Sequence, residues 1–336
     1  MDFRVDEGQR ELAEGIRSML AGRLPLEHLR AREGDEHAIS AADWQALGET
    51  GVFALTLPEP AGTGLGLADA VVVFEELGRA LVPGPLVGTF LAASAGLVDG
   101  AAEGRVQVGA HTVRRPGPVL VEHLGSLDAL LVLDEDGPGQ LLSPVPRGGA
   151  RRMAQPLDPL TPLWQLDALP FGGAVADDNG RLWHDGALLS AALQIGHAAA
   201  VLDLAVAYAK ERQQFGKPIG SFQAIKHMCA DMLVRVEVAR AAVHAAACLS
   251  DAPDVTAAEA AASGCTPGQV RLRSHMGAKL LADEAALINA RAAIQVYGGM
   301  GFTWEVPLHL HLKRARVLST NFHSPADAST ALAAYA

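Results

Sequence analysis

Two short segments combine side chains that can recognise a phosphate or a base with residues that let another molecule approach the backbone. The first contains Arg212 and Phe215, and the second contains Gln295, Gly298 and Gly299. An arginine presents a planar fork of donors that matches a phosphate or an adenine edge, and a neighbouring phenylalanine offers a flat face. Paired glycines permit the close backbone approach that a pyrophosphate needs.

A simpler interpretation of both segments stays open at this point. Arg212 could pair with a surface carboxylate, as exposed arginines often do. Gly298 and Gly299 would then only end the helix that is expected to finish near Val296.

The composition limits the kinds of partner that these residues could serve. With 27 Lys and Arg against 38 Asp and Glu, the formal net charge of the 336 residues is −11, which argues against a nucleic-acid partner. No uncharged apolar run reaches the length of a membrane-spanning helix. Cys229, Cys248 and Cys265 are widely spaced and lack a zinc or disulfide pattern, and the acidic first residues do not resemble a signal peptide. We therefore expect a cytoplasmic protein without a metal or a membrane partner.

The elements that must position the two segments follow from apolar periodicity and from turn residues. Between 101 and 178, prolines and glycines separate short apolar runs that are typical of strands, and residues 134–137 have the pattern of a hairpin turn. Elsewhere the periodicity predicts helices over 6–22, 40–51, 67–82, 87–99, 183–212, 221–251 and 267–296. We therefore predict a mainly α protein with a small β domain: a helical domain over 1–100, a β domain over 101–178 and a helical bundle over 179–336.

Within this order of elements, three segments resemble the acyl-CoA dehydrogenase family. The first runs from Arg212 to Ile219 and continues through Phe222 and Gln223, the second is 295–303, and a weaker third is 74–79. The resemblance spans nearly the whole chain. It implies the acyl-CoA dehydrogenase fold with a C-terminal four-helix bundle, FAD as the cofactor, an acyl-CoA as the substrate and an electron-transfer flavoprotein as the electron acceptor.

In the family that the chain resembles, the two segments of one subunit cover the adenosine and pyrophosphate of an FAD that is held mainly by the neighbouring subunit. Carried over to this sequence, the resemblance implies cofactor-binding roles for Arg212, Phe215, Gln223, Gln295, Gly298 and Gly299.

The same chemistry requires a carboxylate that removes the α-proton of the acyl-CoA. Counting from the segment around Arg314 to the commonest position of that glutamate in the family leads to Phe322. The alternative family position, counted back from Phe215, falls on Gly186. Asp185 stands one residue away with a shorter side chain, and it is the only candidate base that we carry forward.

The β domain also lacks segments that hold the flavin ring in full-length relatives. Neither a Thr-Glu-Pro-x-x-Gly-Ser-Asp stretch nor a Lys-x-Phe/Trp-Ile-Thr/Ser segment occurs between Gly100 and Gly117. The chain thus resembles the short, non-catalytic type of subunit in actinobacterial heterotetrameric dehydrogenases of steroid side chains. That resemblance implies a paralogous catalytic partner, two copies of each chain, a shared FAD and a bulky CoA thioester as the substrate.

Two alternatives remain at this stage. The chain could be a self-sufficient homo-oligomeric dehydrogenase that uses Asp185 or an unrecognised base, or a flavin-free scaffold protein of the same fold. Other polar residues are expected to be structural, with His309, His311, His323 and Asp283 facing solvent.

Overall fold

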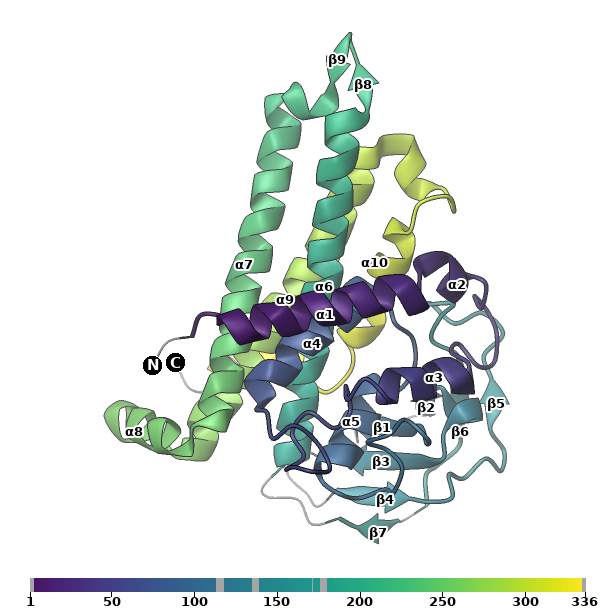
Figure 1. Cartoon of the computed structure of the whole chain (residues 1–336), viewed down its shortest axis with the longest axis vertical. Helices are drawn as coiled ribbons and strands as arrows, with labels where there is room; N and C mark the ends of the chain where they lie inside the picture. The colour runs from purple at the N-terminus through teal and green to yellow at the C-terminus, as the bar shows by residue number, and fades with distance from the viewer. Residues whose placement is uncertain (1–2, 113–117, 135–138, 171, 176–179, 334–336) are drawn as a thin grey trace.

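The computed structural model describes residues 3–112, 118–134, 139–170, 172–175 and 180–333, and it shows long helices standing beside a small β region (Figure 1). Shorter helices of the N-terminal part cross the long ones. These are α1 (Glu7–Arg23), α2 (Leu26–Arg30), α3 (Ala41–Gly48), α4 (Leu67–Arg79) and α5 (Leu86–Ser94). Ser40 is the N-cap of α3, because its hydroxyl accepts a hydrogen bond from the Asp43 backbone N–H at 3.0 Å.

Between residues 108 and 174, the described strands form two small sheets. In the first sheet, with the order β1-β3-β4-β7, β1 pairs in parallel with β3 and the other pairs are antiparallel. The second sheet has the order β2-β6-β5 and is antiparallel. The predicted turn at 134–137 falls almost entirely outside the described residues, although the strands on either side pair antiparallel. The strands are β1 (Val108–Thr112), β2 (Val119–Glu122), β3 (Ala129–Leu133), β4 (Gln140–Leu142), β5 (Arg151–Arg152), β6 (Leu163–Leu166) and β7 (Gly173–Ala174).

The C-terminal half is built around α6 (Arg181–Glu211), α7 (Gln223–Asp251) and α9 (Pro267–Tyr297), with α10 (Leu308–Leu318) packed against α6 and α9. The mainly α fold with small sheets and a helical bundle is therefore confirmed. Shorter elements connect and follow these helices: β8 (Gln213–Gln214), β9 (Lys217–Pro218), η2 (Ile219–Ser221), α8 (Pro253–Ser263), η3 (Gly298–Phe302) and α11 (Pro325–Ala333).

Helix α6 is long and apolar enough to cross a membrane by length and composition. In this fold, 83% of its most apolar stretch is buried against the rest of the protein. Its apolar character is thus explained by its place at the centre of the core, between α4, α7 and α9 (Figure 1).

Two glycines allow α4 to cross α6 at very short range. A Cβ added to Gly78 would lie 2.2 Å from the Leu193 carbonyl oxygen, and one added to Gly196 would lie 2.0 Å from the Glu75 carbonyl oxygen. Side chains of the same α4 segment hold the helices around the crossing, since Glu75 pairs with Arg240 on α7. The weakest of the three family-like segments, 74–79, is therefore a packing motif in this chain.

Arg314 on α10 joins three parts of the chain. Its buried guanidinium pairs with Asp158 and donates to the carbonyl oxygens of Val82, at 3.2 Å, and Leu160, at 3.3 Å. Burial alone would raise the pKa of Asp158, but the charge of Arg314 and its hydrogen bond lower it. This ion pair fixes the position of α10 and of the segment that follows it, which contains Phe322.

Candidate functional site

The two family-like segments meet at one end of the bundle because α6 and α9 end there together. Arg212 is the C-cap of α6, and Gly298 is the C-cap of α9. The rings of Tyr208, one turn before Arg212, and Tyr297, directly before Gly298, stack with their centroids 4.0 Å apart and their planes 11° from parallel. Segments more than eighty residues apart in the sequence therefore lie side by side at this end of the bundle.

Between α6 and α7, the β8–β9 hairpin projects from this end of the molecule (Figure 1). Phe215 at its tip has a φ of +53° and is 90% exposed. Its ring and that of Phe222 meet nearly at right angles at a centroid distance of 6.1 Å, and the Lys217 ammonium lies 4.5 Å from the Phe222 ring centroid. Phe215 is therefore a large aromatic side chain that remains accessible to a molecule outside the chain.

All six residues assigned to the cofactor are exposed: Arg212, Phe215, Gln223, Gln295, Gly298 and Gly299. Gly298 has a φ of +60° and a ψ of −133°, a conformation that requires glycine, so the helix-ending role foreseen for it is confirmed. Gly299 is different, because its φ is ordinary and no atom of the chain lies within 4 Å of an added Cβ. Nothing inside the chain therefore requires glycine at 299, whereas the close approach of an outside group would.

The electrostatics of this surface suit an anion only because of its basic side chains. Two helices end here with their C-termini, which carry partial negative charge and repel a phosphate. Arg212 at the cap of α6 and Lys217 on the hairpin offset that charge. The surface could therefore bind a pyrophosphate by side-chain cations and by the backbone at Gly298 and Gly299.

The two positions expected for the base lie in contact with each other, and neither holds a carboxylate. An added Cβ on Gly186 would lie 2.3 Å and 2.4 Å from ring atoms of Phe322, and 3.1 Å from a methyl carbon of Leu91. Phe322 is 6% exposed, and its ring meets Trp183 edge-on at 5.9 Å. His323 packs against the same tryptophan at 4.0 Å. Aromatic packing thus fills the two positions at which the family resemblance predicts a base.

Asp185, the candidate base, is largely buried at the start of α6. Its carboxylate lies 3.4 Å from the guanidinium of Arg181 one turn earlier. This pairing holds the aspartate as a local partner of arginine, and a one-turn ion pair is an ordinary helix feature. This ion pair is a contact that a structural residue makes, and it does not distinguish Asp185 as a base.

Sequence reasoning missed Glu122, a carboxylate close to the same place. Burial raises the pKa of Glu122, and its Oε1 accepts a hydrogen bond from the Asn321 amide at 3.2 Å, one residue before Phe322. The detectable signal was a lone acid at the end of the apolar run 118–121. This contact ties β2 to the segment after α10 and brings the sheet against the filled site.

Three expectations of solvent-facing residues are wrong. His311 is buried, with its Nδ1 3.1 Å from the Nδ1 of His197, and His323 is buried beside Trp183. Asp283 is 1% exposed and accepts hydrogen bonds from the Lys279 ammonium at 2.6 Å. Periodicity did not reveal the burial of His311 and His323 because their contacts join residues far apart in the sequence. Asp283 pairs with Lys279 within α9, but it also accepts a hydrogen bond at 2.8 Å from Gln194 on α6, whose packing the sequence did not show.

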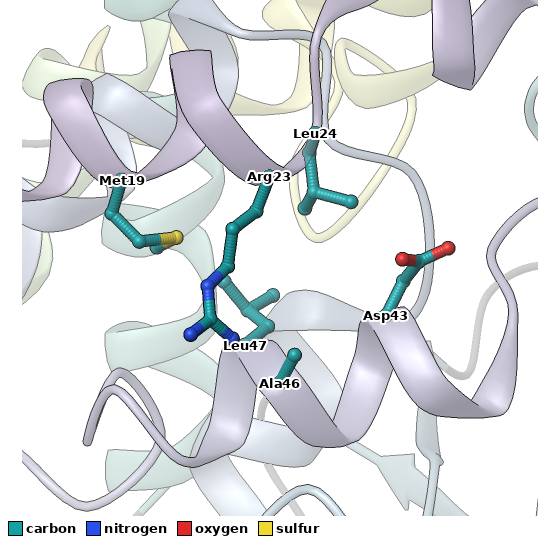
Figure 2. Close-up of a pocket in the computed structure, with 6 residues that line it drawn as sticks. All are labelled: Met19, Arg23, Leu24, Asp43, Ala46 and Leu47. Atoms are coloured by element: carbon teal, nitrogen blue, oxygen red, sulfur yellow. The ribbon is translucent and has the colours of Figure 1, made fainter.

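Two cavities formed by the described residues lie away from both of these regions. One, of about 300 Å³, is bounded by Arg23 on α1 and Asp43 on α3, and Figure 2 shows the arginine side chain reaching across it. The other, of about 250 Å³, lies where α1 and α2 meet α4, and His311 contributes to its wall. Neither cavity is lined by the cap residues of α6 and α9, by Gly186 or by Phe322.

Comparisons with known proteins agree with this arrangement. The family model described as acyl-CoA dehydrogenase, N-terminal domain, matches residues 6–103, and the one described as acyl-CoA dehydrogenase, C-terminal domain, matches residues 182–321. The chain is 35% identical to acyl-CoA dehydrogenase IpdE2 of Mycobacterium tuberculosis over 96% of this chain and 95% of that one. It is 36% identical to IpdE2 of Mycolicibacterium smegmatis, with 93% of each chain covered.

Solved structures share the fold. A variant of the Tcur3481-Tcur3483 steroid ACAD superimposes with a TM-score of 0.78 and 24% identity, covering 99% of this chain and 98% of that one. The ChsE4-ChsE5 complex from Mycobacterium tuberculosis gives a TM-score of 0.76 and 22% identity, covering 99% and 97%.

Proposed function

The chain belongs to the acyl-CoA dehydrogenase family, and from this premise we propose that it is the non-catalytic subunit of a heteromeric FAD-dependent acyl-CoA dehydrogenase. In this proposal it covers the FAD of a paralogous catalytic subunit and contributes no base of its own. The observation that carries the proposal is the contact between Gly186 and Phe322, which fills the expected base position with packed apolar atoms.

The exposed surface at the ends of α6 and α9 fits the outer half of an FAD. Arg212 would bind the pyrophosphate, the exposed face of Phe215 would lie against the adenosine, and the backbone at Gly299 would permit close approach. When bound, the flavin takes up the hydride that leaves the acyl chain. This chain binds and orients the cofactor from outside, and it excludes water from its adenosine half.

The partner in this proposal is a longer paralogue that supplies the ring-holding segments and the carboxylate. Two structures of the same fold are of two-component proteins, the ChsE4-ChsE5 complex and the Tcur3481-Tcur3483 steroid ACAD. By analogy we propose that this chain also works with a different second subunit and on a steroid-type substrate. We propose two copies of each subunit and a bulky steroid side-chain CoA thioester as the substrate. An electron-transfer flavoprotein would reoxidise the flavin, and the assembly would work in the cytoplasm.

Flavin stoichiometry tests the proposal directly. A homotetramer with complete sites carries one flavin per chain, whereas a heterotetramer in which only one type of chain holds the ring carries half of that. We expect the chain purified alone to bind little FAD. We expect the complex co-expressed with its paralogue to contain about one flavin per two chains, by absorbance and by light-scattering mass.

Two outcomes would contradict the proposal. One flavin per chain in the complex would mean that this chain holds a complete site. A yellow and active protein from this chain alone would favour the self-sufficient alternative. Glu122 would then be the first residue to replace by glutamine, since it is the half-buried carboxylate beside Asn321.

A further inference from the structure

A pair of tyrosines connects the two cofactor-covering segments, each of which follows the helix that carries one of these tyrosines. Tyr208 lies in the last turn of α6, and Tyr297 is the last residue of α9. Their rings stack nearly parallel, at a centroid distance of 4.0 Å, and both side chains are half-buried. No other contact described above joins these two helix ends through side chains.

The hydroxyl groups of the same pair reach in opposite directions. The Tyr297 hydroxyl donates back to the Leu204 carbonyl oxygen of α6 at 3.2 Å. The Tyr208 hydroxyl donates to the Met300 sulfur in η3 at 3.7 Å. Tyr297 of α9 therefore contacts α6, and Tyr208 of α6 contacts η3, which directly follows α9. The two hydroxyl groups thus add two contacts between these helix ends.

Backbone contacts carry the position of the rings to the surface residues. The Arg212 backbone N–H donates to the Tyr208 carbonyl oxygen at 2.8 Å, and Gly298 follows Tyr297 directly. The last turns of helices lack part of their internal hydrogen bonds and fray readily. Without a link between them, Arg212 and the turn at Gly298 would move independently.

We propose that Tyr208 and Tyr297 are positioning residues for the shared cofactor. They hold Arg212 and the Gly298–Gly299 turn at the separation at which both can contact one pyrophosphate. This inference rests on the proposed function, because it concerns the same surface. The tyrosines act through Arg212 and Gly298 and are not assigned any contact with the cofactor.

The test compares variants that break the stack with variants that keep it. Tyr208→Leu and Tyr297→Leu remove one ring each, whereas Tyr208→Phe and Tyr297→Phe keep the rings and remove only a hydroxyl. In the co-expressed complex, we expect each leucine variant to raise the dissociation constant of FAD by about 2- to 13-fold, the range that corresponds to one aromatic pair. We expect the phenylalanine variants to stay within about twofold of the unchanged protein.

A second readout does not depend on the cofactor. Amide hydrogen exchange in the flavin-free complex should become faster at 212–220 and 298–302 in the leucine variants and stay unchanged in the phenylalanine variants. Phe90→Leu is the matched control, because it breaks the edge-to-face pair of Phe74 and Phe90, at 5.3 Å, in the N-terminal helices. It should lower the melting temperature without changing FAD affinity or exchange at the two segments.

Arg212→Ala separates the failure of this inference from the failure of the proposed function. If Arg212→Ala weakens FAD binding while Tyr297→Leu and Tyr208→Leu do not, the positioning role is overturned and the shared site stands. If FAD affinity is unchanged in all three variants, the proposed function is overturned together with this inference. Weaker binding in Phe90→Leu to the same degree as in the leucine variants would show a general loss of stability, which also overturns the positioning role.

Discussion

Replacing Gly186 by alanine should destabilise the chain, but should stabilise it once Phe322 has been shortened. In the unchanged protein, the new Cβ would lie 2.3 Å from a rigid, buried ring, and overpacking of this kind costs about 1–3 kcal/mol. Phe322→Ala alone should cost about 3–5 kcal/mol, because it leaves a cavity next to Trp183. In the Phe322→Ala background the added methyl occupies vacated space, so the ordinary preference of a helix for alanine over glycine, about 0.5–1 kcal/mol, should dominate.

Urea unfolding of the full chain, followed by tryptophan fluorescence, measures all four proteins of this cycle. Gly277→Ala in α9 is the matched control, since no atom lies within 4 Å of its added Cβ. We expect that control to be stabilising in both backgrounds. We expect a coupling energy of about 1–3 kcal/mol between Gly186 and Phe322. Additive effects, with Gly186→Ala equally harmful in both backgrounds, would refute the conclusion that Phe322 fills the base position.

Two further predictions concern the cofactor surface and the buried histidines. Gly299→Val should leave the urea midpoint of the chain unchanged, because the added side chain meets open space, but it should lower FAD retention by the complex, because it blocks the close approach of the cofactor. Gly298→Val should lower the urea midpoint itself, because valine does not adopt the φ of +60° found there. Burial lowers the pKa of His275 and His311 from the ordinary 6.5 to about 3, so the unfolded chain binds more protons below pH 6.5. As the pH is lowered from 6.5 to 3, the free energy of unfolding should therefore fall by up to about 1.4 kcal/mol per pH unit for each histidine. An unchanged urea midpoint between pH 7 and pH 5 would contradict this prediction.

The long helices could be predicted from the sequence because their apolar residues recur along the chain at helical spacing. The helix predicted over 267–296 is observed as Pro267–Tyr297, and its capping box at Thr266 lies in the local sequence. Short elements were missed where the signal was weak. Helix α8 begins at Pro253, in a stretch for which no helix was predicted. The helix predicted over 221–251 is observed as Gln223–Asp251, because Ser221 belongs to the 3-10 turn before it.

The candidate site was predictable in part, for a physical reason. Motif residues identify the surface at Arg212 and Gly298, because the fold brings the ends of α6 and α9 together. Counting from the family-like segments also predicted two positions for the base, Gly186 and Phe322, and neither is a carboxylate. What fills them could not be predicted, because the contact of Gly186 with Phe322 joins residues that lie far apart in the sequence. The same limitation hid Glu122, whose partner Asn321 lies 199 positions away.

The contact between Gly186 and Phe322 also makes a carboxylate hard to introduce at either position. A glutamate at 186 would collide with the ring, and a glutamate at 322 would leave a cavity and bring a charge into a site lined by Trp183 and Leu91. We therefore expect neither single substitution to give a stable protein with a carboxylate that could act as a base, so both residues would have to change together. The packing thus couples positions 186 and 322: the residue tolerated at one depends on the size of the residue at the other.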